Sequence, residues 1–282
     1  MAGTSDIVMD AVRTADHDRY LSALYAPADK RNALFALYAF NAEIAGVRDR
    51  IHEPLPGEVR LQWWRDVIAA DADAETGHPI ADALRATIAA NRLPRAAFEN
   101  MLEARIFDLY DDPMPSRTDL EGYCGETAAA LIQFAAMVLD PIAAPGFAEL
   151  AGRAGCAQAI TGLLLLLPLH RRRGQCFVPA DILAAAGTTP EAFVKGEDEA
   201  AAERAVAAMI ALAREHLNAF EKAAPTLPVS LRPAFLPLAL TRAYLDKMET
   251  VGRASLSAPA GLSTLRRHWL LLRHAMRGWT PL

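Results

Sequence analysis

The amino-acid sequence predicts an all-α protein, a helical bundle around a central cavity, built as a single domain over residues 1–282. Three observations predict this fold class. Apolar residues recur at helical spacing along most of the chain, prolines separate these segments, and no useful length shows the alternation of a half-buried strand. Hydrophobic residues make up 52% of the chain, which is enough for a substantial core.

Charge and cysteine content narrow the classes of function. The net charge of −5 argues against general nucleic-acid binding, which requires a basic face. The cysteines, Cys124, Cys156 and Cys176, form no CxxC pair, so we expect reduced thiols and neither disulfides nor a zinc site. The N-terminal residues lack the apolar segment of a secretory signal, and we expect no membrane-spanning segment. These features predict a cytoplasmic protein.

The first half of the chain is expected to form helices separated by proline-containing turns. The third helix has the clearest pattern, because an apolar stripe that includes Leu34 and Leu37 recurs at helical spacing. Two later helices begin at Pro79 and Pro94, where proline is tolerated at the first helical position. The predicted helices cover residues 5–14, 18–25, 28–50, 58–70, 79–91 and 94–110.

The second half is expected to continue with helices of similar length. Thr118 is predicted to cap the first of them, with Glu121 in the capping-box position three residues later. The predicted helices cover residues 118–139, 154–168, 190–194, 200–223, 232–253 and 262–279.

Residues 154–183 are the most informative stretch. Leucine occupies every position from Leu163 to Leu167, which predicts a helix buried on all sides, and Pro168 is expected to bend or end it. A histidine and three arginines follow, His170, Arg171, Arg172 and Arg173. Such a segment fits the basic mouth of a deep pocket for a long apolar ligand with an anionic head. The alternative, which a charge run favours, is a core helix followed by a solvated loop.

The sequence offers little support for a metal site or a catalytic centre. Glu43 and Asp49 lie six residues apart, on different faces of the predicted third helix, and cannot share an ion. Asp108, Asp111 and Asp112 could hold one ion, but a solvated acidic helix end explains them better. No nucleophile, phosphate-loop, dinucleotide or zinc-protease motif occurs. We therefore predict no catalytic residue and no metal or other cofactor.

Several short motifs resemble the squalene/phytoene synthase family. They are Tyr20, Arg31 and Ala36-Leu37-Tyr38-Ala39-Phe40, then Tyr123-Cys124 with Ala128, then Gly174-Gln175-Cys176-Phe177-Val178-Pro179, and finally Arg242 with Tyr244. Each motif alone is weak, but their order and spacing extend over residues 20–272. The resemblance implies an isoprenoid-synthase fold. In active members it also implies magnesium-dependent, head-to-head condensation of two prenyl diphosphates.

The chain departs from the family at the positions that handle diphosphate. By spacing, the first aspartate motif falls on Ala45-Gly46-Val47-Arg48-Asp49, and only its last acid is present. The second motif falls on residues 166–170, so its outer aspartates become Leu166 and His170. The resemblance places a candidate ligand cavity at Tyr38, Asn41, Ala45, Asp49, Tyr123, Gly162, Leu166, His170 and Tyr244, with Arg171, Arg172 and Arg173 as its basic mouth.

These departures resemble a divergent branch of the family that includes an assembly factor for respiratory complex I. Asn41-Ala42-Glu43-Ile44 and Arg60-Leu61-Gln62-Trp63-Trp64 carry this resemblance. We therefore expect a non-catalytic binding or assembly factor that retains an apolar cavity, takes a prenyl or lipid-like ligand and meets membrane-complex partners. One alternative is an active prenyltransferase that uses Mg²⁺ near Asp49 and Asp108. Another is a scaffold whose cavity has filled with side chains.

The last predicted helix joins basic residues to leucine and tryptophan between Arg266 and Arg273. It could lie on an anionic membrane surface, which would place the protein at the periphery of the inner membrane. Docking of this helix on the core, with arginines extended to water, is the alternative that the pattern favours.

Overall fold

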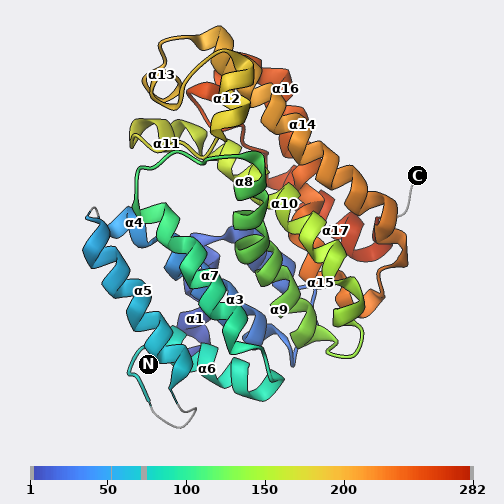
Figure 1. Cartoon of the computed structure of the whole chain (residues 1–282). Coiled ribbons are helices and arrows are strands. Elements are labelled where there is room, and N and C mark those ends of the chain that lie inside the picture. The colour runs from blue at the N-terminus through green and yellow to red at the C-terminus, as the bar shows by residue number, and fades with distance from the viewer. Residues whose placement is uncertain (1–2, 52, 71–74, 280–282) are drawn as a thin grey trace. The chain divides into compact units, whose positions relative to one another are not determined.

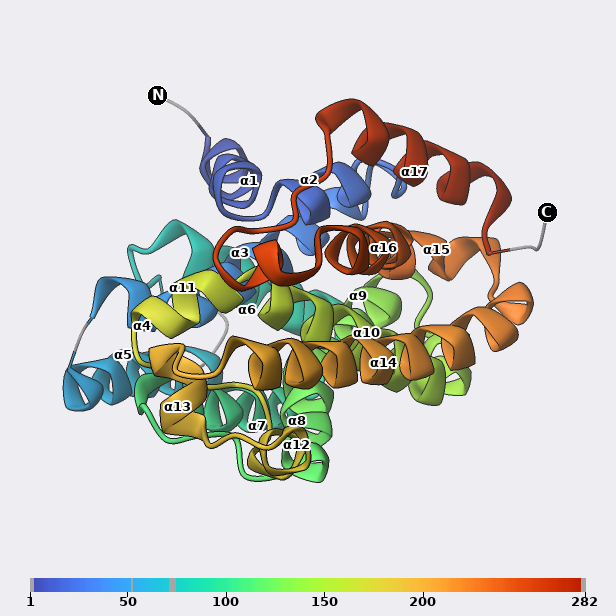
Figure 2. The same ribbon diagram turned by 90° about the horizontal axis from the view of Figure 1, so that it is seen from above.

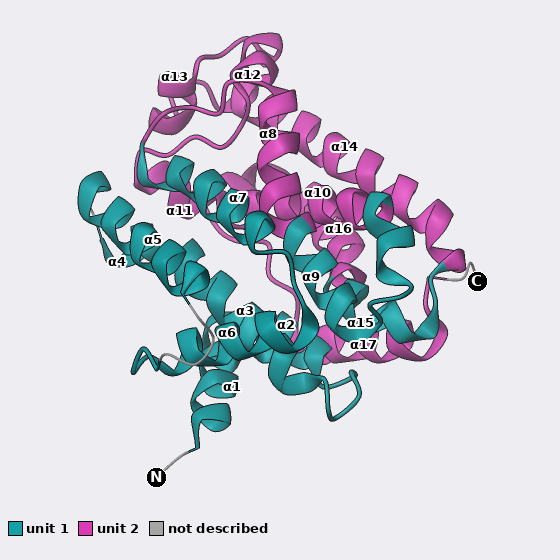
Figure 3. Ribbon diagram, turned by 60° about the horizontal axis from the view of Figure 1, so that its bottom comes forward, with its two compact units in different colours: residues 1–110, 130–149, 227–237 teal, residues 111–129, 150–226, 238–282 magenta. Residues whose placement is uncertain are grey.

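The computed structural model describes residues 3–51, 53–70 and 75–279, and within these ranges the chain forms helices and turns without any strand (Figure 1). The all-α prediction is therefore confirmed. The chain divides into two compact units (Figure 3): unit 1 holds Met1–Tyr110, Ala130–Glu149 and Leu227–Pro237, and unit 2 holds Asp111–Ala129, Leu150–Thr226 and Leu238–Leu282. Neither unit is a continuous stretch of sequence, and the single domain over residues 1–282 stays a prediction.

Unit 1 is built around α3 (Arg31–Ala45), whose buried residues run without a break from Leu34 to Asn41. Such a helix needs neighbours on every side, and α1, α2, α6, α7 and α9 pack against it. The other helices of unit 1 are α1 (Thr4–Ala15), α2 (His17–Ala23), α4 (Val47–Arg50), α5 (Pro54–Ala69), α6 (Pro79–Asn91), α7 (Arg95–Ile106), α9 (Ala130–Leu139) and α15 (Arg232–Phe235).

Aromatic side chains form the centre of unit 1. Phe40 on α3 contacts Trp64 on α5 and Phe98 on α7, with ring centroids 5.1 and 5.7 Å apart. Phe98 in turn stacks on Phe134 of α9, with centroids 4.0 Å apart and rings within 6° of parallel. These four rings connect helices that lie far apart in the sequence.

The prediction of one long helix over residues 28–50 is wrong in two respects. The helix begins at Arg31, and it is broken at Gly46, after which α4 forms a separate short turn. Glycine weakens a helix interior, and the freed end is bound by Arg50, which donates to the Glu43 carbonyl oxygen over 2.7 Å.

Unit 2 is built along α14 (Glu199–Ala223), which packs against α12 (Ala180–Ala186) and α16 (Thr241–Val251). The apolar side of α14 is buried in unit 2. Asp198 caps the first turn of α14, because its carboxylate accepts from the Ala201 N–H over 2.9 Å. The remaining helices are α8 (Arg117–Cys124), α10 (Ala148–Leu165), α11 (Leu167–Arg172), α13 (Pro190–Lys195) and α17 (Thr264–Arg277).

The helix predicted over residues 118–139 forms, with two differences. Ser116, and not Thr118, caps it, because the Ser116 hydroxyl accepts from the Asp119 N–H over 3.2 Å. A π-helical turn at Gly125–Ala129 separates α8 from α9. At this turn the backbone comes very close to α10: a Cβ on Gly155 would lie 2.4 Å from the Ala129 Cα, so only glycine fits there.

The leucine run is not buried on all sides, so that expectation is wrong. Leu164 and Leu167 are buried, whereas Leu166 is 49% exposed. Successive residues on a helix point about 100° apart, so a helix with one side at the surface can bury only some of five adjacent leucines. The prediction for Pro168 is confirmed, because α10 ends at Leu165 and Pro168 lies in the first turn of α11.

One helical stretch within the described residues, Arg117–Leu139, is long and apolar enough to cross a membrane by length and composition. We had expected no membrane-spanning segment from the sequence. Half of its most apolar window is buried inside the fold, and core helices pass the same test, so this stretch is weak evidence for a membrane span.

Candidate functional site

Four of the predicted cavity residues lie in unit 1, along α3 and α4. Tyr38 and Asn41 are buried, and Ala45 and Asp49 at the following turns are exposed. The Tyr38 hydroxyl is buried without a hydrogen-bond partner in the described part of the chain, and burial raises its pKa to about 12. The Arg19 guanidinium lies 6.0 Å from the centre of the Tyr38 ring. Tyr38 is thus a neutral, buried phenol.

Asn41 belongs to a polar cluster that the sequence did not reveal. Arg105 on α7 donates to the Asn41 amide oxygen over 3.4 Å and pairs with Asp108 over 2.9 Å. Asp108 is buried, so the expectation of a solvated acidic helix end is wrong for this residue, although Asp111 and Asp112 are exposed. The sequence did not indicate Arg105 as a site residue, because a cation in the last turn of a helix is ordinarily explained by the helix dipole.

The other five predicted cavity residues lie in unit 2. His170 is buried against Phe177, with ring centroids 4.6 Å apart, and the Tyr123 ring centroid lies 6.2 Å from that of Phe177. Unit 2 therefore brings Tyr123 and His170 to one aromatic residue. Gly162 and Tyr244 are half-buried, and Leu166 is exposed.

The segment from Gly174 to Pro179 places Phe177 by backbone hydrogen bonds. Gly174 takes a positive φ of 79°, which lets the chain turn sharply after α11. The Cys176 carbonyl oxygen then accepts from the Met114 N–H over 3.1 Å. Burial raises the pKa of the Cys176 thiol to about 11, so the thiol stays protonated near neutral pH.

The three arginines of the predicted basic mouth have different environments. Arg171 is half-buried: it donates to the Leu256 carbonyl oxygen over 3.4 Å, and its guanidinium lies 5.4 Å from the centre of the Phe193 ring. Burial lowers the pKa of Arg171. Arg172 and Arg173 are exposed, so the outward charge of this segment comes from these two residues.

A second polar cluster in unit 2 surrounds Glu121. Its carboxylate accepts from Arg117 over 2.9 Å and lies 3.0 Å from His216 on α14. Glu121 therefore pairs with side chains, where the sequence analysis had given it a capping role. The spacing of Arg117 and Glu121, one helical turn apart, was a signal for part of this cluster. Beside it, a hydrogen bond with Cys124 lowers the pKa of the buried Cys156 thiol.

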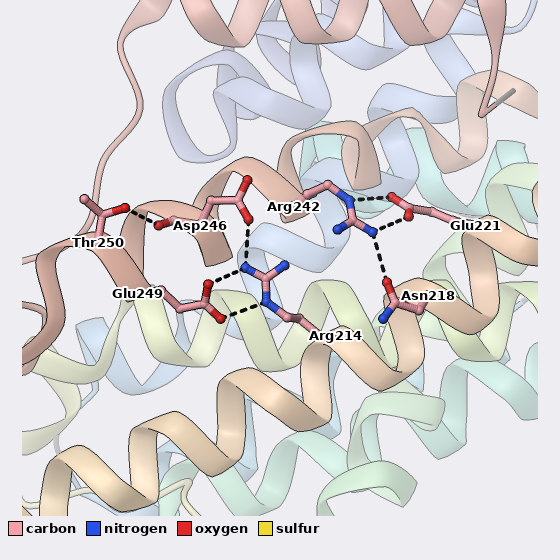
Figure 4. Close-up of polar contacts among 7 residues, drawn as sticks. All are labelled: Arg214, Asn218, Glu221, Arg242, Asp246, Glu249 and Thr250. Carbon is pink, nitrogen blue, oxygen red and sulfur yellow. Dashed lines mark hydrogen bonds and ion pairs between the residues drawn. The ribbon is translucent and has the colours of Figure 1, made fainter. Parts of the chain in front are cut away.

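A hollow in unit 2 lies where α14, α16 and α17 meet. Its volume is about 460 Å³, and charged side chains such as Glu221, Arg242 and Arg273 share its wall with Leu238 and Trp279. Ion pairs between α14 and α16 extend from it (Figure 4): Arg242 pairs with Glu221, and Arg214 binds Asp246 and Glu249, each over 2.7 Å. None of the predicted cavity residues is among the residues that line this hollow.

Among the described residues, no three His, Cys, Asp or Glu side chains lie close enough together to hold one metal ion. The two acids of the alternative site differ in environment, because Asp49 is exposed and Asp108 is paired with Arg105.

Comparison with known proteins identifies relatives along most of the chain. Residues 12–273 match the sequence profile of the squalene/phytoene synthase family. The chain is 28% identical to human "NADH dehydrogenase (ubiquinone) complex I, assembly factor 6", over 88% of this chain and 75% of that protein. The Bos taurus protein of the same name is 27% identical, over 89% and 75%. Presqualene diphosphate synthase of Sinorhizobium fredii is 25% identical, over 91% and 92%.

Solved structures share the fold. A dehydrosqualene synthase in complex with ligand aligns with a TM-score of 0.82 at 17% identity, over 96% of this chain and 94% of that one. The squalene synthase HpnC from Alicyclobacillus acidocaldarius aligns with a TM-score of 0.73 at 19% identity, over 89% and 94%. The predicted isoprenoid-synthase fold is therefore confirmed.

Proposed function

Because this chain belongs to the squalene/phytoene synthase family, we propose that it uses the scaffold of that family as a non-catalytic assembly factor. The observation that carries the proposal is the similarity, over nearly nine tenths of the chain, to relatives named as assembly factors of complex I. It would act in the assembly of respiratory complex I, and it would do so at the periphery of the membrane that holds this complex.

The side chains at the diphosphate-handling positions support a role without magnesium. Magnesium takes oxygen ligands, chiefly carboxylates, and bridges them to phosphates. Residues 154–180 contain no carboxylate, and in place of the expected acids stand the exposed Leu166 and His170, which packs on Phe177. Asp108 is already paired with Arg105. This donor set does not suit magnesium, so we derive no reaction step through the ion.

The ligand that we propose is prenyl or lipid-like and is bound without turnover. The neutral Tyr38 phenol and the aromatic group of Tyr123, His170 and Phe177 suit apolar chains better than a diphosphate. The exposed Arg172 and Arg173 could meet an anionic head.

Calorimetry with a non-hydrolysable farnesyl diphosphate analogue, with and without Mg²⁺, tests this proposal. The presqualene diphosphate synthase of Sinorhizobium fredii serves as the control that should need the ion. We expect the same binding to this chain in both conditions. Binding that depends on Mg²⁺ would contradict the proposal, and absence of binding in both would remove the lipid ligand while leaving the assembly role to be tested in cells.

An active prenyltransferase is the second candidate, and the similarity to a presqualene diphosphate synthase favours it. Incubation with farnesyl diphosphate, Mg²⁺ and a reductant, followed by product analysis, separates the two. A prenyl product that disappears in Asp49→Asn would establish the enzyme and reject the non-catalytic role.

A further inference from the structure

Helix α17 is attached to unit 2 by few side chains. It begins after Ser263, whose hydroxyl accepts from the Arg266 N–H over 3.4 Å, and Leu271 is its one fully buried residue. Trp279 follows the helix and packs edge-on against Phe220 of α14, with ring centroids 5.1 Å apart. The helix, red in Figure 2, shares the wall of the 460 Å³ hollow with α16. Most of its surface is therefore available for another contact.

The outer face of α17 is apolar. Leu265, Trp269, Leu272 and Met276 are 82%, 64%, 40% and 72% exposed. Their spacing of four, three and four residues places them on one stripe along the helix, which we call the α17 stripe. A continuous exposed apolar stripe on an otherwise folded protein marks an interaction surface, whereas single exposed apolar residues need no explanation.

The charges that α17 itself carries have one sign. The helix contains four arginines, two histidines and no aspartate or glutamate, although the whole chain carries a net charge of −5. At 3.6 residues per turn, Arg266, Arg273 and Arg277 fall along one flank of the stripe. Arg266 and Arg273 line the hollow together with Glu221 and Asp246, which pair with Arg242 and Arg214.

We propose that α17 binds the surface of an anionic membrane, with the α17 stripe buried at the boundary of headgroups and acyl chains. Amphipathic helices bind membranes by this combination of apolar area and attraction to anionic lipid. Tryptophan suits the interface, and each arginine near the surface adds attraction to acidic headgroups. A protein partner would be expected to face a rim of mixed charge, which α17 lacks. This inference does not depend on the proposed assembly function, because it concerns only the chain and lipid.

Flotation of the full chain with vesicles tests the proposal. The vesicles are of phosphatidylcholine, either alone or with added phosphatidylglycerol and cardiolipin, at low and at physiological salt. We expect flotation with the anionic vesicles, less of it at higher salt, and little with neutral vesicles. The emission of Trp269 should shift to the blue on binding, and Trp269→Phe should remove that shift.

Two matched pairs of variants assign the contact to α17. Leu265→Ser with Met276→Ser should reduce partitioning at least about tenfold, whereas Ile142→Ser with Val229→Ser, at 93% and 69% exposed sites elsewhere, should not.

Arg266→Glu with Arg273→Glu should also reduce partitioning at least about tenfold, because each arginine increases partitioning to anionic vesicles about fivefold. Lys195→Glu with Lys222→Glu, which makes the same change in net charge, should have little effect. Circular dichroism confirms that each variant is folded.

Three results would overturn the proposal. The first is no flotation of the wild-type chain with anionic vesicles. The second is equal flotation of the stripe variant and its control. The third is a wild-type dimer that the stripe variant converts to a monomer without any lipid binding, since the stripe would then join two copies of the chain.

Discussion

Gly155→Ala should destabilise unit 2, because α10 and the π-helical turn touch through their backbones at this point. The added Cβ would lie 2.4 Å from the Ala129 N and Cα atoms, where ordinary contact begins at 3.4 Å. The overlap is therefore about 1 Å and involves backbone, so no side-chain rotation relieves it.

The magnitude follows from two opposing terms. Overpacking of this kind costs about 3 kcal/mol when the backbone must move. Replacing glycine by alanine inside a helix returns about 1 kcal/mol. The net loss of about 2 kcal/mol corresponds to a fall in melting temperature of roughly 3–4 °C if the whole chain unfolds in one transition.

Thermal unfolding followed by circular dichroism measures this loss, and Gly152→Ala on the same helix is the control. A Cβ at Gly152 meets no atom within 4 Å, so that variant should melt at the same or a slightly higher temperature. If the two units melt separately, the transition that moves should be that of unit 2. Equal melting temperatures for the two variants would refute the close approach of Gly155 and Ala129.

Three further predictions concern single residues. Burial lowers the pKa of His274. Below about pH 6.5 the unfolded chain therefore binds a proton that the folded chain does not bind, and the free energy of unfolding decreases as the pH decreases. Between about pH 7.5 and about pH 5.5 the urea midpoint of His274→Asn should fall less than that of the wild type, and an equal fall would contradict this. Arg214→Ala should cost about 1–2 kcal/mol in urea unfolding, since two carboxylates on α16 lose their partner, and Arg253→Ala, whose side chain is 58% exposed, should cost less. Phe134→Ala should cost about 3–5 kcal/mol by removing the stack on Phe98, and a loss below about 1 kcal/mol would refute that packing.

The sequence predicts most helices well because their signals are local. The helix over residues 79–91 has the predicted bounds, since Pro79 at its start and the apolar period are both visible in the sequence. The helix predicted over residues 200–223 begins one residue earlier, at Glu199. Errors occur where two local signals compete, as at Gly46, where a glycine interrupts an otherwise continuous apolar stripe.

The candidate site is less predictable because its contacts are distant in sequence. Arg105 reaches Asn41 across 64 residues, and no local pattern pairs them. Burial of the leucine run likewise depends on which neighbours pack on α10 and α11, and the sequence does not show these neighbours. For this reason Leu166 was predicted to be buried, although it is exposed. Family resemblance named Tyr123 and His170, but their meeting at Phe177 follows only from the folded backbone at Gly174 to Pro179.

The level of assembled complex I in cells of the source organism that lack this chain is the measurement that bears most directly on an assembly role without catalysis. We expect deletion to lower the level of assembled complex I on native gels. We also expect Asp49→Asn, which removes the one acid left in the first motif, to restore the complex as fully as the wild-type chain does. Normal complex I in the deletion strain, or a folded Asp49→Asn protein that fails to restore it, would contradict this role.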